Sequence, residues 1–128
     1  MASSTTSITS GFDYQARHFW LLACRLFCAH TKVARIGFEL DEVRGFDDIV
    51  LYYAEPIPSE RGDLVAADHH QVKFHVDHGG AFTWQSLMDP GFIGATRYSL
   101  LQKTQSAAEL AGSEARRLIV LSPWQIQP

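Results

Sequence analysis

The segment DDIVLYYA, residues 47–54, determines the fold that the sequence predicts. Two aspartates precede five consecutive apolar residues of the β-branched, aliphatic and aromatic kinds that favour strands. A continuous apolar run, without alternation of polar residues, is typical of a strand that is buried on both faces. We therefore predict a central strand over residues 47–54.

Three further apolar segments predict the other strands of the same sheet. They cover residues 33–40 (VARIGFEL), 64–76 (LVAADHHQVKFHV) and 116–122 (RRLIVLS). Short links join the first three strands, which predicts an antiparallel meander, whereas the last strand follows a helix and can return in parallel.

Two helices complete the expected fold. The first runs from Ser10, as N-cap, to about residue 30, with a buried apolar stripe that includes Phe19, Trp20 and Phe27. The second covers residues 91–112 and ends at a C-cap glycine, after a short helical turn before Pro90. The order αβββαβ predicts an α/β fold, with helices packed on a mixed central sheet.

The length of 128 residues corresponds to one domain. We expect a disordered Ser/Thr-rich leader over residues 1–9, the domain over 10–122, and the start of a linker to a further domain over 123–128. No stretch approaches the roughly 20 apolar residues of a membrane span, and no secretory signal is visible. Cys24 and Cys28 are expected to be reduced core residues, which fits a cytoplasmic protein. The net charge of −3 argues against a free-standing sequence-specific DNA-binding protein.

A lysine in the third strand points to a functional site. Gln71 and Lys73 share one face of the strand, about 6.6 Å apart, because side chains alternate. A buried lysine needs an anionic partner or a polar cleft. Either Asp47 or Asp48, at the start of the preceding strand, and Glu39, in the first strand, can supply the anion.

Histidines flank this pair, at positions 69, 70, 75 and 78. Imidazole suits zinc or iron, so a histidine-metal enzyme or sensor is one alternative. However, His70 points away from His69 and His75, and the latter two lie about 20 Å apart along a strand. We therefore interpret the histidines as exposed or hydrogen-bonded neighbours of the cleft, with His69 or His75 available to contact a DNA phosphate.

The order of these motifs resembles the PD-(D/E)XK, or restriction-endonuclease-like, nuclease family, with DDI opening the second strand and QVK in the third. The segments GFDYQARHFW (11–20), FELDEVRGFDDIVL (38–51) and HHQVKFH (69–75) are closer still to one group. They resemble the N-terminal double-stranded-DNA endonuclease domain of bacterial anti-phage effectors, which accompany cyclic-oligonucleotide signalling and related defence systems. The resemblance spans residues 11–122.

This resemblance implies a metal-dependent DNA endonuclease that uses Mg²⁺, with Mn²⁺ as a substitute. The metal ligands would be the Asp48 carboxylate, the Gln71 amide oxygen and the Val72 carbonyl, with Glu39 as a second carboxylate. Lys73 would position the attacking water and stabilise the developing negative charge. Asp47 stays an alternative to Asp48.

Gln71 departs from the acidic form of the family pattern. Because a neutral ligand binds a cation more weakly, Glu39 becomes more important. The resemblance further implies that Gln15, in the first helix, orients the metal ligands.

The resemblance also implies partners: duplex DNA, further copies in a homo-oligomer, and a sensor or ATPase domain or subunit, with no membrane. The alternative reading is a catalytically inactive module of the same fold that binds DNA or a protein partner.

Overall fold

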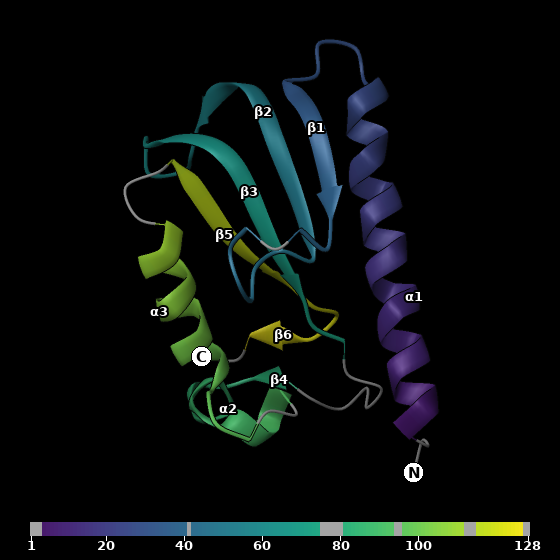
Figure 1. Cartoon of the computed structure of the whole chain (residues 1–128), viewed down its shortest axis with the longest axis vertical. Helices are drawn as coiled ribbons and strands as arrows, with labels where there is room; N and C mark the ends of the chain where they lie inside the picture. Colours follow the sequence, from purple (N-terminus) through teal and green to yellow (C-terminus); the bar gives the residue numbers. More distant parts are fainter. Residues whose placement is uncertain (1–3, 41, 75–80, 94–95, 112–114, 127–128) are drawn as a thin grey trace.

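A four-stranded mixed sheet organises the chain (Figure 1). The computed structural model describes residues 4–40, 42–74, 81–93, 96–111 and 115–126. The strand order is β1-β2-β3-β5, with bounds β1 (Val33–Phe38), β2 (Ile49–Pro58), β3 (Leu64–Val72) and β5 (Arg116–Leu121). Neighbours among β1, β2 and β3 are antiparallel, and β5 is parallel to β3. These observations confirm the mixed sheet, the meander and the parallel last strand.

The central strand has the burial that its apolar run predicts. Ile49, Val50 and Leu51 are fully buried, with strands on both sides and packed layers on both faces. The strand also continues to Pro58, beyond the predicted end at residue 54. Its pairing with β3 is irregular between Tyr52 and Ile57, and Ile57 then packs on the core, which explains the extension.

The third strand ends earlier than its sequence predicts. β3 ends at Val72 rather than residue 76, although the Lys73 N–H still donates to the Leu121 carbonyl at 2.8 Å. His75 and His78 lie outside the described residues.

The first helix, α1 (Ser4–Ala23), begins before Ser10, so the expected N-cap at Ser10 is wrong. Residues 4–9 are helical and are not a leader without structure. A helix that has already nucleated adds residues at low cost, and no proline stops it here. A 3₁₀ turn, η1 (Cys24–Phe27), follows α1.

The expected burial of the aromatic stripe is wrong for Trp20 and Phe27, whereas Phe19 is half-buried and contacts Phe38. Trp20 is 68% exposed and Phe27 89% exposed, because α1 and η1 contact the sheet along one side only, through residues such as Leu22 and Leu26. Cys24 and Cys28 are free but exposed, so they are not core residues.

The second long helix, α3 (Leu100–Ala111), begins well after residue 91. Ser99 sets this start as a capping box. Its hydroxyl accepts from the Gln102 N–H at 3.2 Å, and the Gln102 side chain accepts from the Ser99 N–H at 2.9 Å. The expected C-cap Gly112 lies outside the described residues.

Shorter elements connect the sheet to α3. The helical turn expected before Pro90 is present as α2 (Trp84–Met88), capped by Thr83, and a 3₁₀ turn, η2 (Pro90–Ile93), follows it. The sequence does not predict the small parallel pair formed by β4 (Ala81–Phe82) and β6 (Gln125–Ile126).

Two apolar clusters cover opposite faces of the main sheet. One contains Leu51 and Tyr53 and packs against Leu22 and Leu26. The other joins Val43 and Phe46, from the β1–β2 connection, to Ala107 of α3, with Leu118 packed against it. Leu51 pairs with Asp68, and Asp68 with Arg117, so Leu118 points to the face opposite Leu51. The β1–β2 connection is therefore held beneath α3.

Candidate functional site

The predicted site residues meet at one edge of the main sheet. Phe38 pairs with Ile49 and Ile49 with His70, so the end of β1, the start of β2 and the end of β3 coincide. The next residues along these strands are Glu39, Asp48 and Gln71. The Glu39 N–H donates to the Asp48 carbonyl at 3.0 Å, which continues the strand pairing into the site.

Asp48 is tied directly to the end of β3. Its Oδ2 accepts a hydrogen bond from the Val72 N–H at 2.7 Å, so the carboxylate lies against the main chain between Gln71 and Lys73. Asp47 precedes it, and the Asp47 carbonyl accepts from the Leu40 N–H at 3.0 Å. The structure therefore places the Asp48 carboxylate against the Gln-Val-Lys segment.

The electrostatic environment of Asp48 reflects several close charges. Burial raises the pKa of Asp48, the Val72 hydrogen bond and the charge of Lys73 lower it, and the charge of Glu39 raises it. Burial also lowers the pKa of Lys73, as does the charge of Lys103 on α3, whereas Asp48 raises it. The carboxylate and the ammonium are thus partly desolvated and interact with each other.

Glu39 and Gln15 form a second contact at the same edge. The Gln15 amide, buried on α1, donates to the Glu39 Oε1 at 3.4 Å. Glu39 has a φ of +50°, in the left-handed region that costs a residue with a side chain free energy. This strained conformation at the end of β1 accompanies a carboxylate held between α1 and Asp48.

The donor atoms at this edge suit a hard cation. Within the described part of the chain, no three His, Cys, Asp or Glu side chains gather as a metal site. The candidate donors are instead two carboxylates, Asp48 and Glu39, with the Gln71 amide oxygen and the Val72 carbonyl. Mg²⁺ prefers oxygen ligands of this kind. Because burial and Glu39 both disfavour the charge of Asp48, a divalent cation would offset both effects, and the donor set fits Mg²⁺.

The two described histidines of β3 are structural. The His69 ring is 0% exposed, and its Nδ1 lies 3.2 Å from the Phe46 carbonyl. His70 Nδ1 lies 3.1 Å from the Ile49 carbonyl. A carbonyl only accepts, so Nδ1 carries the proton in both rings, and His69 Nε2 accepts from Arg116 at 2.7 Å. The interpretation as hydrogen-bonded residues is confirmed, but the expectation that His69 can contact a DNA phosphate is wrong because its ring is buried.

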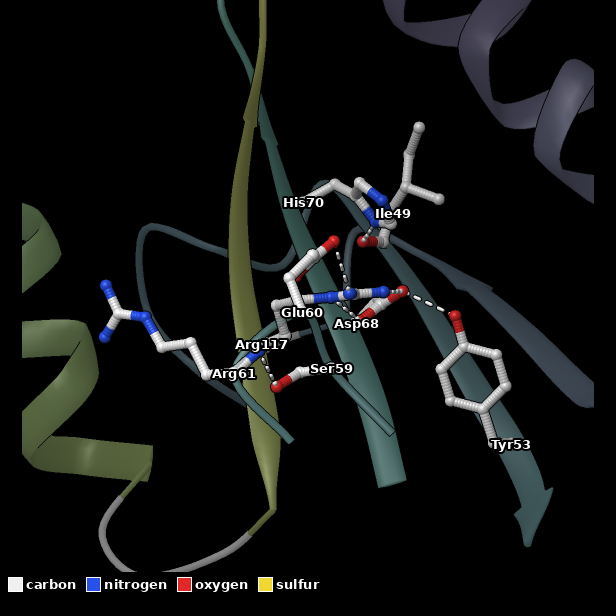
Figure 2. Close-up of polar contacts among 8 residues, drawn as sticks. All are labelled: Ile49, Tyr53, Ser59, Glu60, Arg61, Asp68, His70 and Arg117. Atoms are coloured by element: carbon white, nitrogen blue, oxygen red, sulfur yellow. Dashed lines mark hydrogen bonds and ion pairs between the residues drawn. The ribbon is translucent and has the colours of Figure 1, made fainter. Parts of the chain in front are cut away.

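A buried ion pair that the sequence interpretation missed links the strands on the opposite face (Figure 2). Asp68 is 2% exposed and binds the Arg117 guanidinium through both oxygens, each at 2.8 Å. The Tyr53 hydroxyl donates to the same carboxylate, and Glu60 lies 3.4 Å from Arg117. The sequence feature that could have indicated this pair is an acidic residue in one apolar strand and an arginine in another. This cluster ties β2, β3 and β5 together.

Across the described ranges, none of the helices has both the length and the apolar character to cross a membrane.

No protein-family model matches the chain. The chain is similar to the CD-NTase-associated protein 4 of Enterobacter hormaechei subsp. hoffmannii (strain UCI 50), with 39% identity over 108 residues. The match covers 84% of this chain and 22% of that relative, so the chain spans about a fifth of the relative's length.

Proposed function

We propose that the chain is a metal-dependent DNA endonuclease domain with the PD-(D/E)XK fold, acting as an effector in bacterial anti-phage defence. The observation that carries this proposal is the hydrogen bond from Val72 to Asp48, which brings a carboxylate to the Gln-Val-Lys segment. The relative's name associates that protein with a CD-NTase. This agrees with the resemblance of the sequence to effectors of cyclic-oligonucleotide defence systems.

Each site residue has a role in phosphodiester hydrolysis. Asp48, Glu39, the Gln71 amide oxygen and the Val72 carbonyl hold the cation, and the Gln15 amide orients Glu39. When bound, Mg²⁺ or Mn²⁺ supplies charge neutralisation and a more acidic water. The Lys73 ammonium lies beside Asp48, where its positive charge positions the attacking water and stabilises negative charge that develops on the phosphate.

The proposed substrate is duplex DNA in the cytoplasm. Cutting both strands requires two sites, so we propose a homo-oligomer. The chain is small relative to the protein that it resembles, and we propose that a sensor or ATPase domain or subunit controls the assembly.

The test is cleavage of supercoiled plasmid in Mg²⁺ and in Mn²⁺, at protein concentrations high enough for the chain to form the proposed oligomer. We expect wild type to nick and linearise the plasmid, and Lys73→Ala and Asp48→Asn each to lose at least about 10²-fold in rate. The matched control is Asp63→Asn, which removes an exposed carboxylate at the opposite end of the sheet. Cleavage by Lys73→Ala at the wild-type rate would contradict the proposal.

The alternative of an inactive DNA- or partner-binding module gives a different result. In that case the oligomeric protein leaves the plasmid intact in both metals, and Lys73→Ala behaves as wild type.

A further inference from the structure

A basic pocket lies between the β1–β2 connection and α3. Its volume is about 650 Å³. Three cationic side chains line it, together with a turn glycine and polar and apolar residues: Arg44, Gly45, Arg97, Tyr98, Lys103, Ser106 and Leu110. These residues come from three separate segments, so only the folded chain brings them together.

The β1–β2 connection presents Arg44 to this pocket. Val43 and Phe46 are buried against Ala107 of α3, and the Phe46 N–H donates to the Val43 carbonyl at 2.9 Å, closing a tight turn. Gly45 has a φ of +89° within that turn, a conformation that favours glycine. Because the residues on either side of the turn point inward, Arg44 at its tip is exposed to solvent.

Helix α3 and the segment before it supply the other wall. Lys103, Ser106 and Leu110 are spaced three and four residues apart, so they share one face of the helix. The Arg97 guanidinium lies 5.2 Å from the centroid of the Tyr98 ring, which is half-exposed. The wall therefore offers two cations and two hydroxyl groups to a ligand.

The positive charges of this pocket are not neutralised by acidic side chains of its described lining. No acidic side chain is among its described lining residues, and Arg44, Arg97 and Lys103 have no carboxylate within ion-pair distance in the described ranges. The chain as a whole carries a net charge of −3, yet these three cationic side chains line one pocket. Arginine forks and a lysine charge are the side chains that bind phosphate oxygens.

The pocket adjoins the candidate site. Arg44 lies in the connection whose two ends carry Glu39 and Asp48. Gln71 shares a face of β3 with His69, which pairs with Leu118, and Leu118 packs against the cluster that contains Ala107 of α3. An anion in the pocket therefore lies beside the site and on the same face of the sheet as α3.

We propose that Arg44, Arg97 and Lys103 bind backbone phosphates of duplex DNA that flank the phosphodiester held at Asp48 and Lys73. This inference rests on the DNA substrate of the proposed function and adds the surface that positions it. Phosphate contacts fix the position of a duplex without reading its sequence. The surface accordingly predicts binding that is strongly dependent on salt and nearly independent of sequence.

The experiment measures DNA binding without cleavage. A fluorescein-labelled 20-bp duplex is titrated with the full chain in EDTA, and anisotropy is recorded over a series of KCl concentrations. The test variant is Arg44→Gln/Lys103→Gln. Its matched control is Lys32→Gln/Arg61→Gln, which removes the same charge from exposed positions at the opposite end of the sheet. Circular dichroism melting verifies that every variant is folded.

We expect the test variant to bind at least about 10-fold more weakly, with a salt slope shallower by about 1.8, since each lost phosphate contact removes about 0.9. The control should keep the wild-type affinity and slope to within about twofold. Equal affinity and slope for wild type and test variant would overturn the inference, as would an equal loss in the control.

Failure of the proposed catalysis gives a different pattern. If plasmid cleavage is absent but Arg44→Gln/Lys103→Gln still loses duplex binding, the phosphate surface stands and the endonuclease does not. If Lys73→Ala abolishes cleavage while the test variant binds and cleaves as wild type, the endonuclease stands and the phosphate surface does not.

Discussion

The Asp48 carboxylate accepts a hydrogen bond from the Val72 N–H at 2.7 Å, so an acid at the start of β2 is tied to the main chain at the end of β3. This bond joins segments that are 24 residues apart and sets the carboxylate beside Lys73. Asp48 therefore has two roles that a mutation can separate: it accepts a hydrogen bond, and it supplies a negative charge. An uncharged amide oxygen can keep the first role but not the second.

Asp48→Asn should therefore keep the fold and lose the response to metal. The amide oxygen can still accept from Val72, whereas the charge that attracts a cation is gone. Without metal, removing a partly buried charge should leave thermal stability unchanged or slightly higher. In Mg²⁺ at a hundredfold excess over its dissociation constant, wild type should gain about 2.7 kcal/mol and Asp48→Asn nothing, as measured by thermal melting. Asp63→Asn serves as the control, and an equal Mg²⁺ effect in Asp48→Asn would contradict the metal assignment.

The Asp68–Arg117 pair should dominate the effect of mutations in the sheet. Arg117→Ala leaves a buried carboxylate without its cation and should lower the free energy of unfolding by about 3–5 kcal/mol. Arg61→Ala removes an exposed arginine from the nearby hairpin and should change it by less than about 0.5 kcal/mol. Urea unfolding measures both, and similar small losses in the two variants would show that the ion pair contributes little.

The same pair predicts the stability of the protein in acid. Burial by itself would raise the pKa of Asp68, but the hydrogen bonds from Arg117 and Tyr53 outweigh it and hold that pKa below the ordinary value of 3.8. The stabilisation is therefore complete above pH 3.8 and is lost as the pH falls through the lower pKa of the folded state. Over this acid range, the free energy of unfolding of Asp68→Asn should depend less on pH than that of wild type. Parallel pH profiles would contradict this expectation.

His69 should affect stability without affecting metal content. Burial and then the Arg116 charge lower the pKa of His69 below its ordinary value of 6.5. Just below pH 6.5, His69 is therefore protonated more readily in the unfolded chain than in the folded one. The free energy of unfolding should fall as the pH drops below 6.5, and it should fall less steeply in His69→Gln. Urea unfolding at several pH values measures this. Zinc or iron bound stoichiometrically to wild type and lost in His69→Ala would instead support a histidine-metal protein.

Two phenylalanines should respond oppositely to truncation. Phe46 is fully buried beneath α3, and Phe46→Ala should cost about 3–5 kcal/mol. Phe27 projects into solvent, and Phe27→Ala should change stability by less than about 0.5 kcal/mol. Chemical denaturation of both variants measures the difference. A large loss for Phe27→Ala in the isolated chain would contradict the exposed position of this side chain.

Local patterns were sufficient for the sheet but not for the ends of its elements. The run at 49–51 predicted a strand that is buried on both faces, as the structure shows. The segment 116–122 also predicted its strand, although β5 lies at the edge of the sheet and its residues are mostly half-buried. Helix limits were less predictable. α1 extends through weak helix formers before Ser10, and the start of α3 depends on the reciprocal bonds of Ser99 and Gln102.

The sequence by itself determined the mixed sheet and its antiparallel meander, because strand patterns and link lengths are local properties. Residue chemistry also marked Gln71 and Lys73 as candidates, with Glu39 and either Asp47 or Asp48 as the acids. The tertiary structure decided that the Asp48 carboxylate reaches β3, that His69 is buried, and that Asp68 pairs with Arg117. It also decided that Arg44 lines the same pocket as Lys103. The physical reason is that burial and pairing depend on contacts between segments distant along the chain, which periodicity within one segment does not contain.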